Sequence, residues 1–180
     1  MMSANHAFDR SKIKILLLEN IHEKAVKNLK DNGFTNIEYM NRALAEDEFC
    51  EKIKDVHMVG LRSKTKLTKK VLENANKLRV VGTFSVGTNQ IDLETTGEMG
   101  IPVFNAPFSS TRSVAELVMA EIVWCFRGIS EKNIGAHQGH WRKSVKNSYE
   151  VRAKNLGIVG YGHIGSQVSV LASAFGMHVY

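Results

Sequence analysis

The chain has 180 residues, of which 43% are hydrophobic and 23% are charged. This composition is typical of a globular protein and excludes a disordered chain, which lacks the apolar residues needed to offset the entropy cost of ordering. No apolar run approaches the about 20 residues that span a bilayer, and the polar N-terminus has no signal-peptide core, so we expect a cytoplasmic protein without membrane contact.

The charge is unevenly distributed. The formal net charge is +6, and one local run of basic residues contains Arg62, Lys64, Lys66, Lys69 and Lys70. Such a run is often only a solvated helix entrance. Because no aromatic residues are interleaved with it, nucleic acid is a poor candidate partner, and a small anion fits better.

The first 105 residues alternate short apolar runs with amphipathic segments. The apolar runs predict strands at 13–18, 37–39, 57–61, 79–84 and 101–105. Helical spacing of apolar residues predicts helices at 23–32 and 46–54, and Gly33 is placed to end the first in a left-handed turn. Thr68 is expected to cap a third, short helix with its hydroxyl group. Strands and helices that alternate at this spacing predict parallel βαβ units and an open α/β sheet.

Beyond residue 107 the pattern changes. Ser113 and Glu116 form a capping-box signature, which predicts a helix that begins at this point. Only one residue in 117–126 is charged, so this helix must be buried on most sides. We expect it to pack in a domain core and against a second subunit, with another part of the same chain as the alternative cover. The polar segment 128–154 is expected to be irregular.

The cysteines and histidines give no sign of a disulfide or a metal site. Cys50 and Cys125 lie within apolar helical patterns, and we expect buried thiols of a reducing compartment. His137 and His140 lie three residues apart in a polar stretch without further ligands beside them, so no metal site is expected.

Three glycines follow an expected strand at 156–160 and open a helix. Gly160, Gly162 and Gly165 form the pattern G-x-G-x-x-G. In a dinucleotide-binding unit the first glycine permits the turn, the second lets the backbone approach a pyrophosphate, and the third allows close helix–strand packing. The helix N-terminus offers unpaired N–H groups to the phosphates. A glycine-rich turn without a ligand is the alternative, but this context favours an NAD-type cofactor.

Together these segments resemble the D-isomer-specific 2-hydroxyacid dehydrogenase family. The likeness is carried by 60–65, 87–92, 100–107, 110–116 and 160–165. It implies an N-terminal arm at 1–11, the N-terminal part of a flavodoxin-like substrate domain at 12–106, and an incomplete Rossmann NAD-binding domain at 107–180.

The resemblance also implies roles for individual residues. The loop that holds the anionic group of the substrate matches Arg62, Ser63 and Lys64, and the turn that meets its carboxylate matches Ser85, Val86 and Gly87. The positions on the pyrophosphate of NAD match Gly160, Gly162, His163, Ile164 and Gly165. The family's catalytic arginine, glutamate and histidine are expected downstream of Tyr180, so we expect the chain alone to be inactive.

The implied reaction is the NAD-dependent oxidation of 3-phosphoglycerate to 3-phosphooxypyruvate, the first step of the phosphorylated route to L-serine. The resemblance implies a homo-oligomer that associates through the helix at 113–126. A different substrate, such as 2-hydroxyglutarate or glycerate, is one alternative, because Arg62 and Lys64 suit any dianion. A further hypothesis is a fragment that binds NAD or self-associates without catalysis.

Overall fold

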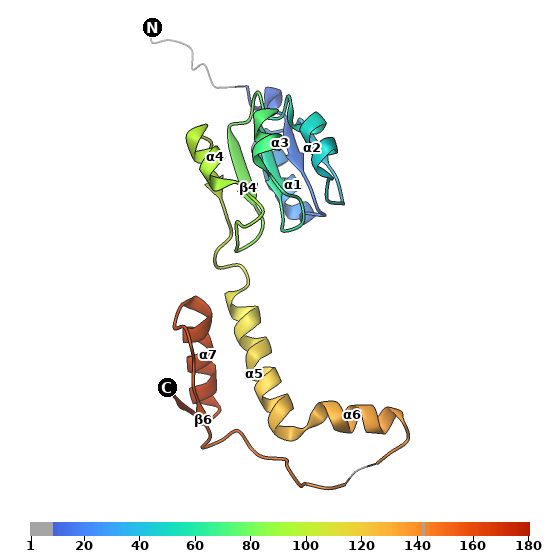
Figure 1. The fold of residues 1–180 in the computed structure, drawn as a ribbon, viewed down its shortest axis with the longest axis vertical. Helices are drawn as coiled ribbons and strands as arrows, with labels where there is room; N and C mark the ends of the chain where they lie inside the picture. Colours follow the sequence, from blue (N-terminus) through green and yellow to red (C-terminus); the bar gives the residue numbers. More distant parts are fainter. Residues whose placement is uncertain (1–8, 142) are drawn as a thin grey trace. The chain divides into compact units, whose positions relative to one another are not determined.

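The computed structural model describes residues 9–141 and 143–180. The chain divides into two compact units, one that ends at Pro107 and one that spans Phe108–Tyr180 (Figure 1). Within the described ranges, no helix is long and apolar enough to cross a membrane.

The first unit is built on a parallel sheet of five strands. Its strands are β1 (Ile15–Leu17), β2 (Ile37–Tyr39), β3 (Met58–Leu61), β4 (Val80–Thr83) and β5 (Val103–Phe104). All neighbours pair in parallel in the order β2-β1-β3-β4-β5, which confirms the predicted open α/β sheet. This is the flavodoxin-like order, in which the direction of winding reverses between β1 and β3.

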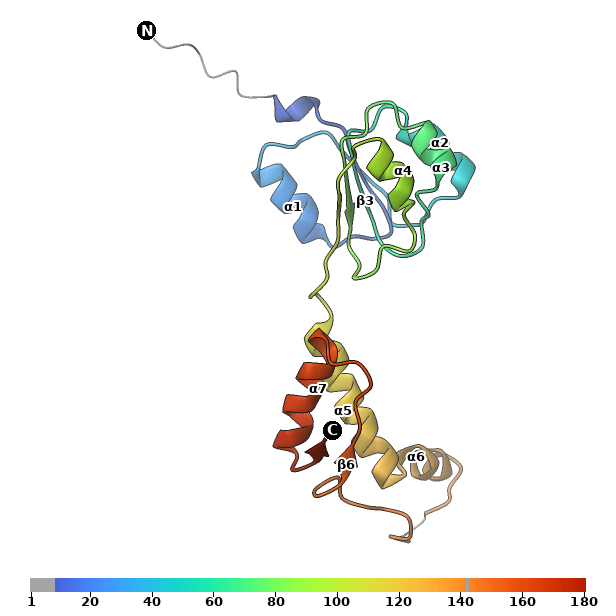
Figure 2. The ribbon, with the colours of Figure 1, turned by 60° about the vertical axis from the view of Figure 1, so that its left-hand side comes forward.

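Helices cover both faces of this sheet because side chains along a strand alternate between faces. Its helices are η1 (Arg10–Lys12), α1 (Glu23–Asp31), α2 (Glu46–Ile53), α3 (Lys69–Glu73) and α4 (Leu93–Glu98). Ile15 and Leu17 pack with residues of α1, whereas Leu16 packs with residues of α2 and α3. Figure 2 shows α1 on one side of the sheet and α2, α3 and α4 on the other.

Two details of the first unit differ from the sequence-based expectations. Thr68 stands at the N-cap of α3, but its hydroxyl donates to Oε1 of Glu46 at 2.6 Å and does not accept a helix N–H. Helix α4 was not predicted, because it has six residues and buries the threonines Thr95 and Thr96 instead of an apolar stripe. Gly33 does follow α1 with a φ of 86°, as expected.

The second unit pairs two long helices with a short sheet. Its elements are α5 (Thr111–Arg127), α6 (Ile129–His137), β6 (Asn155–Leu156), α7 (His163–Ala174) and β7 (His178–Val179). Strands β6 and β7 are parallel. The buried cluster between α5, α7 and the sheet consists of Ala115, Met119, Val168, Ala172 and Met177.

The capping box predicted at Ser113 is wrong. Helix α5 begins at Thr111, so Ser113 lies inside its first turn and its hydroxyl donates to the Ser110 carbonyl at 3.0 Å. Glu116 instead accepts from Nε of Arg112 at 2.6 Å. With the N-cap at Ser110, Glu116 lies six residues beyond the cap and not three, so its carboxylate is too far along the helix for a capping-box bond.

Helix α5 is buried on one side and exposed on the other within this chain, so the predicted cover by a second subunit stays a prediction. Leu117 is 58% exposed and Trp124 is 44% exposed, so the chain itself covers one side of the helix only. Cys125 is exposed, which contradicts the expected buried thiol, whereas Cys50 is buried as expected. The segment 128–154 is not irregular throughout, because Gly128 ends α5 with a φ of 58° and α6 follows directly.

Candidate functional site

The loops after β1, β2 and β3 enclose a pocket of about 520 Å³ in the first unit. Its lining consists of Glu19, Asn20, Asn41, Arg42, Ala43, Arg62, Ser63 and Lys64. Ligands of open α/β sheets bind at the carboxyl ends of the strands, where the winding direction reverses. The pocket lies at this position, and it contains the predicted residues Arg62, Ser63 and Lys64 together with a third cation, Arg42.

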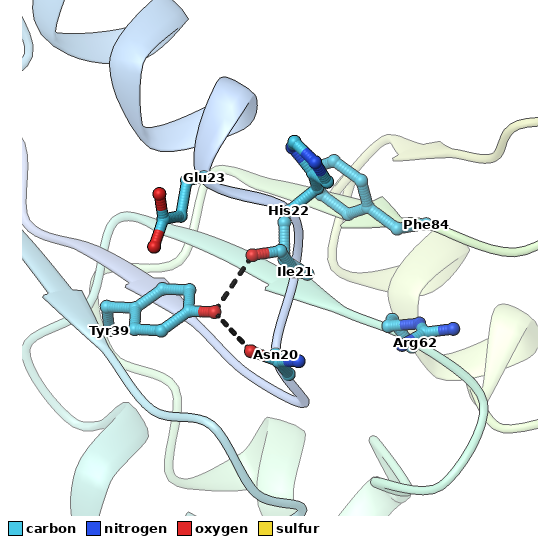
Figure 3. Close-up of a pocket in the computed structure, with 7 residues that line it drawn as sticks. All are labelled: Asn20, Ile21, His22, Glu23, Tyr39, Arg62 and Phe84. Atoms are coloured by element: carbon cyan, nitrogen blue, oxygen red, sulfur yellow. Dashed lines mark hydrogen bonds between the residues drawn. The ribbon is translucent and has the colours of Figure 1, made fainter.

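A neighbouring pocket of about 570 Å³ shares Asn20 and Arg62 with the first, and its other lining residues are Ile21, His22, Glu23, Tyr39 and Phe84. Tyr39 places its hydroxyl 2.9 Å from both Oδ1 of Asn20 and the Ile21 carbonyl (Figure 3). Because it lines both pockets, the Arg62 side chain can reach an anion in either of them.

The loop that carries Arg62 is held by a buried carboxylate. Oε1 of Glu19 accepts from the backbone N–H groups of Thr65 at 2.8 Å and Arg62 at 3.2 Å, and Oε2 accepts from that of Lys64 at 2.9 Å. Burial alone would raise the pKa of the Glu19 carboxyl, but these N–H groups and the Thr65 hydroxyl hold the pKa below its ordinary value. The group is therefore ionised at neutral pH.

The predicted turn 85–87 is tied to the same loop by one side chain. Nε2 of Gln90 lies 2.7 Å from the Arg62 carbonyl, 2.7 Å from Oγ1 of Thr83 and 3.1 Å from Oγ of Ser85. The Ser85 hydroxyl also donates to the Gly87 carbonyl at 2.7 Å. The structure thus brings Arg62 and Ser85 together through Gln90.

Sequence reasoning did not identify Glu19 or Gln90 as site residues. Glu19 is a charged residue directly after an apolar strand, at the edge of the sheet where ligands bind. This position could have identified it as a candidate site residue from the sequence. Gln90 carried no such signal. Its three partners are set by the packing of separate loops.

In the second unit, the glycine turn between β6 and α7 has the geometry expected of a phosphate-binding turn. Gly160 has a φ of 94°, which favours glycine. A Cβ atom on Gly165 would lie 2.2 Å from the Gly160 carbonyl oxygen, whereas one on Gly162 would meet no atom within 4 Å. Close packing therefore requires glycine at 165, and at 162 the side of the backbone that a Cβ would occupy faces open space.

The first turn of α7 presents backbone N–H groups at this point. Its N-cap is Gly162, which has no side chain to accept them, and the first bond back to the cap runs from the Ser166 N–H to the Gly162 carbonyl at 2.9 Å. The His163 ring packs edge-to-face on Phe108 with centroids 4.6 Å apart. His163 and Ile164 are therefore placed to offer their backbone, and the residues present fit a dinucleotide pyrophosphate.

The comparisons with known proteins identify the family of the chain. The sequence profile of the D-isomer specific 2-hydroxyacid dehydrogenase, catalytic domain, matches residues 15–173. The chain belongs to this family. It is 53% identical over 179 residues to D-3-phosphoglycerate dehydrogenase of Haemophilus influenzae, a match that covers 99% of the chain and 44% of that relative. The chain thus spans less than half the length of this curated relative.

Solved structures share the fold. The TT0316 protein from Thermus thermophilus superposes with a TM-score of 0.83 at 27% identity, over 93% of this chain and 55% of that one. D-lactate dehydrogenase from Aquifex aeolicus, solved with NAD and lactic acid, gives a TM-score of 0.78 at 25% identity, over 92% and 50%.

Proposed function

We propose that the chain is the N-terminal portion of a D-3-phosphoglycerate dehydrogenase, which oxidises 3-phosphoglycerate to 3-phosphooxypyruvate with NAD in the cytoplasm, as the first step of a phosphorylated route to L-serine. One observation carries this proposal. Arg62, Ser63 and Lys64 line a pocket at the reversal point of the sheet, in a chain 53% identical to a relative with that activity.

The proposed substrate has a phosphate dianion at one end and a carboxylate at the other. Arg62 can grip a phosphate with two parallel N–H groups, while Lys64 adds a point charge and Ser63 a hydroxyl donor. The turn 85–87, which Gln90 holds beside Arg62, is proposed to meet the carboxylate. The loop 62–64 and the turn 85–87 would thus hold the substrate at both ends and fix the orientation of C2, the carbon that loses the hydride.

NAD supplies the acceptor for the hydride that leaves C2 of the substrate. The chain's part is to bind its pyrophosphate through Gly160, Gly162, Gly165 and the N–H groups of His163 and Ile164. The histidine and glutamate of the proton transfer, and the arginine that orients the carboxylate, are proposed to lie beyond Tyr180. The isolated chain is accordingly expected to bind ligands without turnover.

Self-association is proposed to occur through α5. Leu117 and Trp124 are seven residues apart on one side of this helix, and both remain exposed. An apolar helix face of this kind is typical of a subunit interface.

A chimaera tests the catalytic proposal. This chain replaces the matching segment of the H. influenzae relative, and NADH formation is followed with 3-phosphoglycerate, 2-hydroxyglutarate and glycerate as substrates. We expect turnover with 3-phosphoglycerate and a loss of about 10- to 100-fold in kcat/KM for Arg62→Ala, mainly through KM.

The matched control is Lys66→Ala, because Lys66 belongs to the same basic run but does not line the pocket of about 520 Å³. Its kcat/KM should stay close to that of the unsubstituted chimaera. Turnover of 2-hydroxyglutarate or glycerate in place of 3-phosphoglycerate would contradict the proposed substrate and leave the family activity intact.

A further inference from the structure

Glu19 is an unusual residue in the pocket of the first unit. It is a carboxylate with 7% of its surface exposed, in a protein interior that rarely accepts a charge. Its backbone φ is 60° and that of Asn20 is 54°, so two successive non-glycine residues adopt the left-handed conformation. Such strain persists only where the surrounding contacts hold it, and it gathers at functional sites.

Those contacts run from Glu19 to two other loops. Its carboxylate accepts the N–H groups of Arg62, Lys64 and Thr65, which are 43–46 residues away in the sequence. Its own N–H donates to the Arg42 carbonyl at 3.1 Å, and its carbonyl lies 3.5 Å from Nη1 of Arg62.

The three basic side chains of the pocket therefore stand on backbone that one residue holds. Arg42, Arg62 and Lys64 come from the loops after β2 and β3, and Glu19 bonds to the main chain of each. Because its oxygens accept backbone N–H groups, the carboxylate orders the loop without pairing with the charged ends of Arg62 and Lys64. The Arg42 guanidinium is instead paired with the Glu48 carboxylate, at 2.6 and 2.8 Å.

We propose that Glu19 is a positioning residue for anion binding, whose carboxylate fixes the backbone of Arg62 and Lys64 so that both cations meet one phosphate group. The identity of that phosphate as part of 3-phosphoglycerate rests on the proposed function. The positioning role itself applies to any phosphate-bearing ligand of this pocket.

Simple electrostatics and the positioning role predict opposite effects of Glu19 removal on anion affinity, so an experiment can distinguish them. Removal of a negative charge beside an anion site should strengthen anion binding through the Coulomb interaction alone. If Glu19 acts by positioning, Glu19→Gln should weaken binding instead. The amide would keep one oxygen for Arg62 and Thr65 but would turn an N–H group toward the Lys64 N–H.

The test is calorimetric titration of the 180-residue chain with inorganic phosphate and with 3-phosphoglycerate, for the wild type, Glu19→Gln and Glu19→Asp. It is run where circular dichroism shows each variant fully folded. We expect both variants to bind phosphate about tenfold more weakly or worse, although Glu19→Asp keeps the charge, because its shorter side chain cannot span to the loop. Amide hydrogen exchange at Lys64 and Thr65 should become faster in both.

The matched control is Asp92→Asn. Asp92 is also a carboxylate that accepts a backbone N–H, that of Thr95 at 3.0 Å, but it caps α4. Asparagine is a good N-cap, and phosphate affinity should stay unchanged.

Each outcome separates the two proposals. Unchanged or tighter phosphate binding by folded Glu19→Gln overturns the positioning role, whatever the substrate. Phosphate binding that depends on Glu19, without binding of 3-phosphoglycerate, supports the positioning role and contradicts the proposed substrate. Absence of any anion binding by the wild type overturns both.

Discussion

At the scale of single residues, different structural constraints require glycine at the positions between β6 and α7. At Gly165 the neighbour is protein, since a Cβ atom would lie 2.2 Å from the Gly160 carbonyl oxygen. At Gly162 a Cβ atom would meet no atom within 4 Å. Gly165 therefore serves packing, and Gly162 is free to serve a ligand.

Alanine at these two positions should separate folding from cofactor binding. Gly165→Ala is expected to lower the free energy of unfolding of the second unit by about 2–4 kcal/mol, because the helix must move away from the turn. Gly162→Ala should stay within about 1 kcal/mol of the wild type yet lose NAD binding. Urea unfolding and NAD titration of both variants check this. NAD binding by Gly162→Ala at wild-type strength would count against the proposed pyrophosphate site.

Glu19 also sets a pH dependence of stability. Its pKa in the folded chain is below the ordinary value of 4.5, so the unfolded chain binds more protons as the pH falls. The stabilisation is fully present above the ordinary value and is lost as the pH falls through the lower pKa of the folded state. Glu19→Gln should therefore be less stable than the wild type by about 1–3 kcal/mol at neutral pH, with a gap that closes in acid.

Unfolding curves of the two proteins from neutral pH to about pH 3 measure that gap. Asp47→Asn is the control, because this exposed carboxylate pairs with Lys70 at the surface and its contribution is screened. A gap between Glu19→Gln and the wild type that is independent of pH would contradict the assignment of the stabilisation to the ionised carboxylate.

At the scale of elements, one side of α5 is buried against the second unit's own core and the other side is exposed. Met119 is buried against α7, whereas Leu117 lies on the exposed side and is 58% exposed. A charge at Met119 would disrupt the core of the second unit and would say nothing about association. Leu117 is therefore the position at which an interface can be tested.

Leu117→Glu is expected to shift the chain toward the monomer in sedimentation velocity, with the free energy of unfolding of the monomer within about 0.5 kcal/mol of the wild type. A charge in the centre of an apolar interface is left without water or a partner. Leu93→Glu is the matched control, since Leu93 is a 50% exposed leucine at the start of α4 in the other unit. Unaltered association of Leu117→Glu would argue against α5 as the interface.

The same elements show what the sequence could predict. The strands of the first unit were predicted because a parallel strand buried on both faces is a continuous apolar run. Helix α4 was not predicted because its buried side chains are threonines, which give no apolar periodicity. Helix α6 was not predicted because none of its nine residues is buried. The three N–H groups on Glu19 join residues 43–46 positions apart, and no local pattern encodes such bonds.

At the scale of the whole molecule, the two units differ in how much they bury. The first packs apolar side chains on both faces of its sheet, with Phe49, Ile53 and Leu61 fully buried on one of them. Among the described residues of the second, the buried cluster is the small set of Ala115, Met119, Val168, Ala172 and Met177. Stability follows buried apolar area, so the second unit should unfold first.

This difference gives each proposed ligand its own signature. A ligand that binds only the folded state adds about 2.7 kcal/mol at a concentration of 100 times its Kd, and it adds this to the unit that holds it. Hydrogen exchange followed by mass spectrometry should show 3-phosphoglycerate slowing exchange in the loops after β1 and β3, and NAD slowing exchange in the turn 160–165 and α7.

Because the second unit starts from lower stability, NAD should also raise the midpoint of the first of two unfolding transitions, while 3-phosphoglycerate raises the midpoint of the second. A single transition that both ligands shift equally would mean that the two units unfold as one, and would contradict the independence inferred from their separate cores.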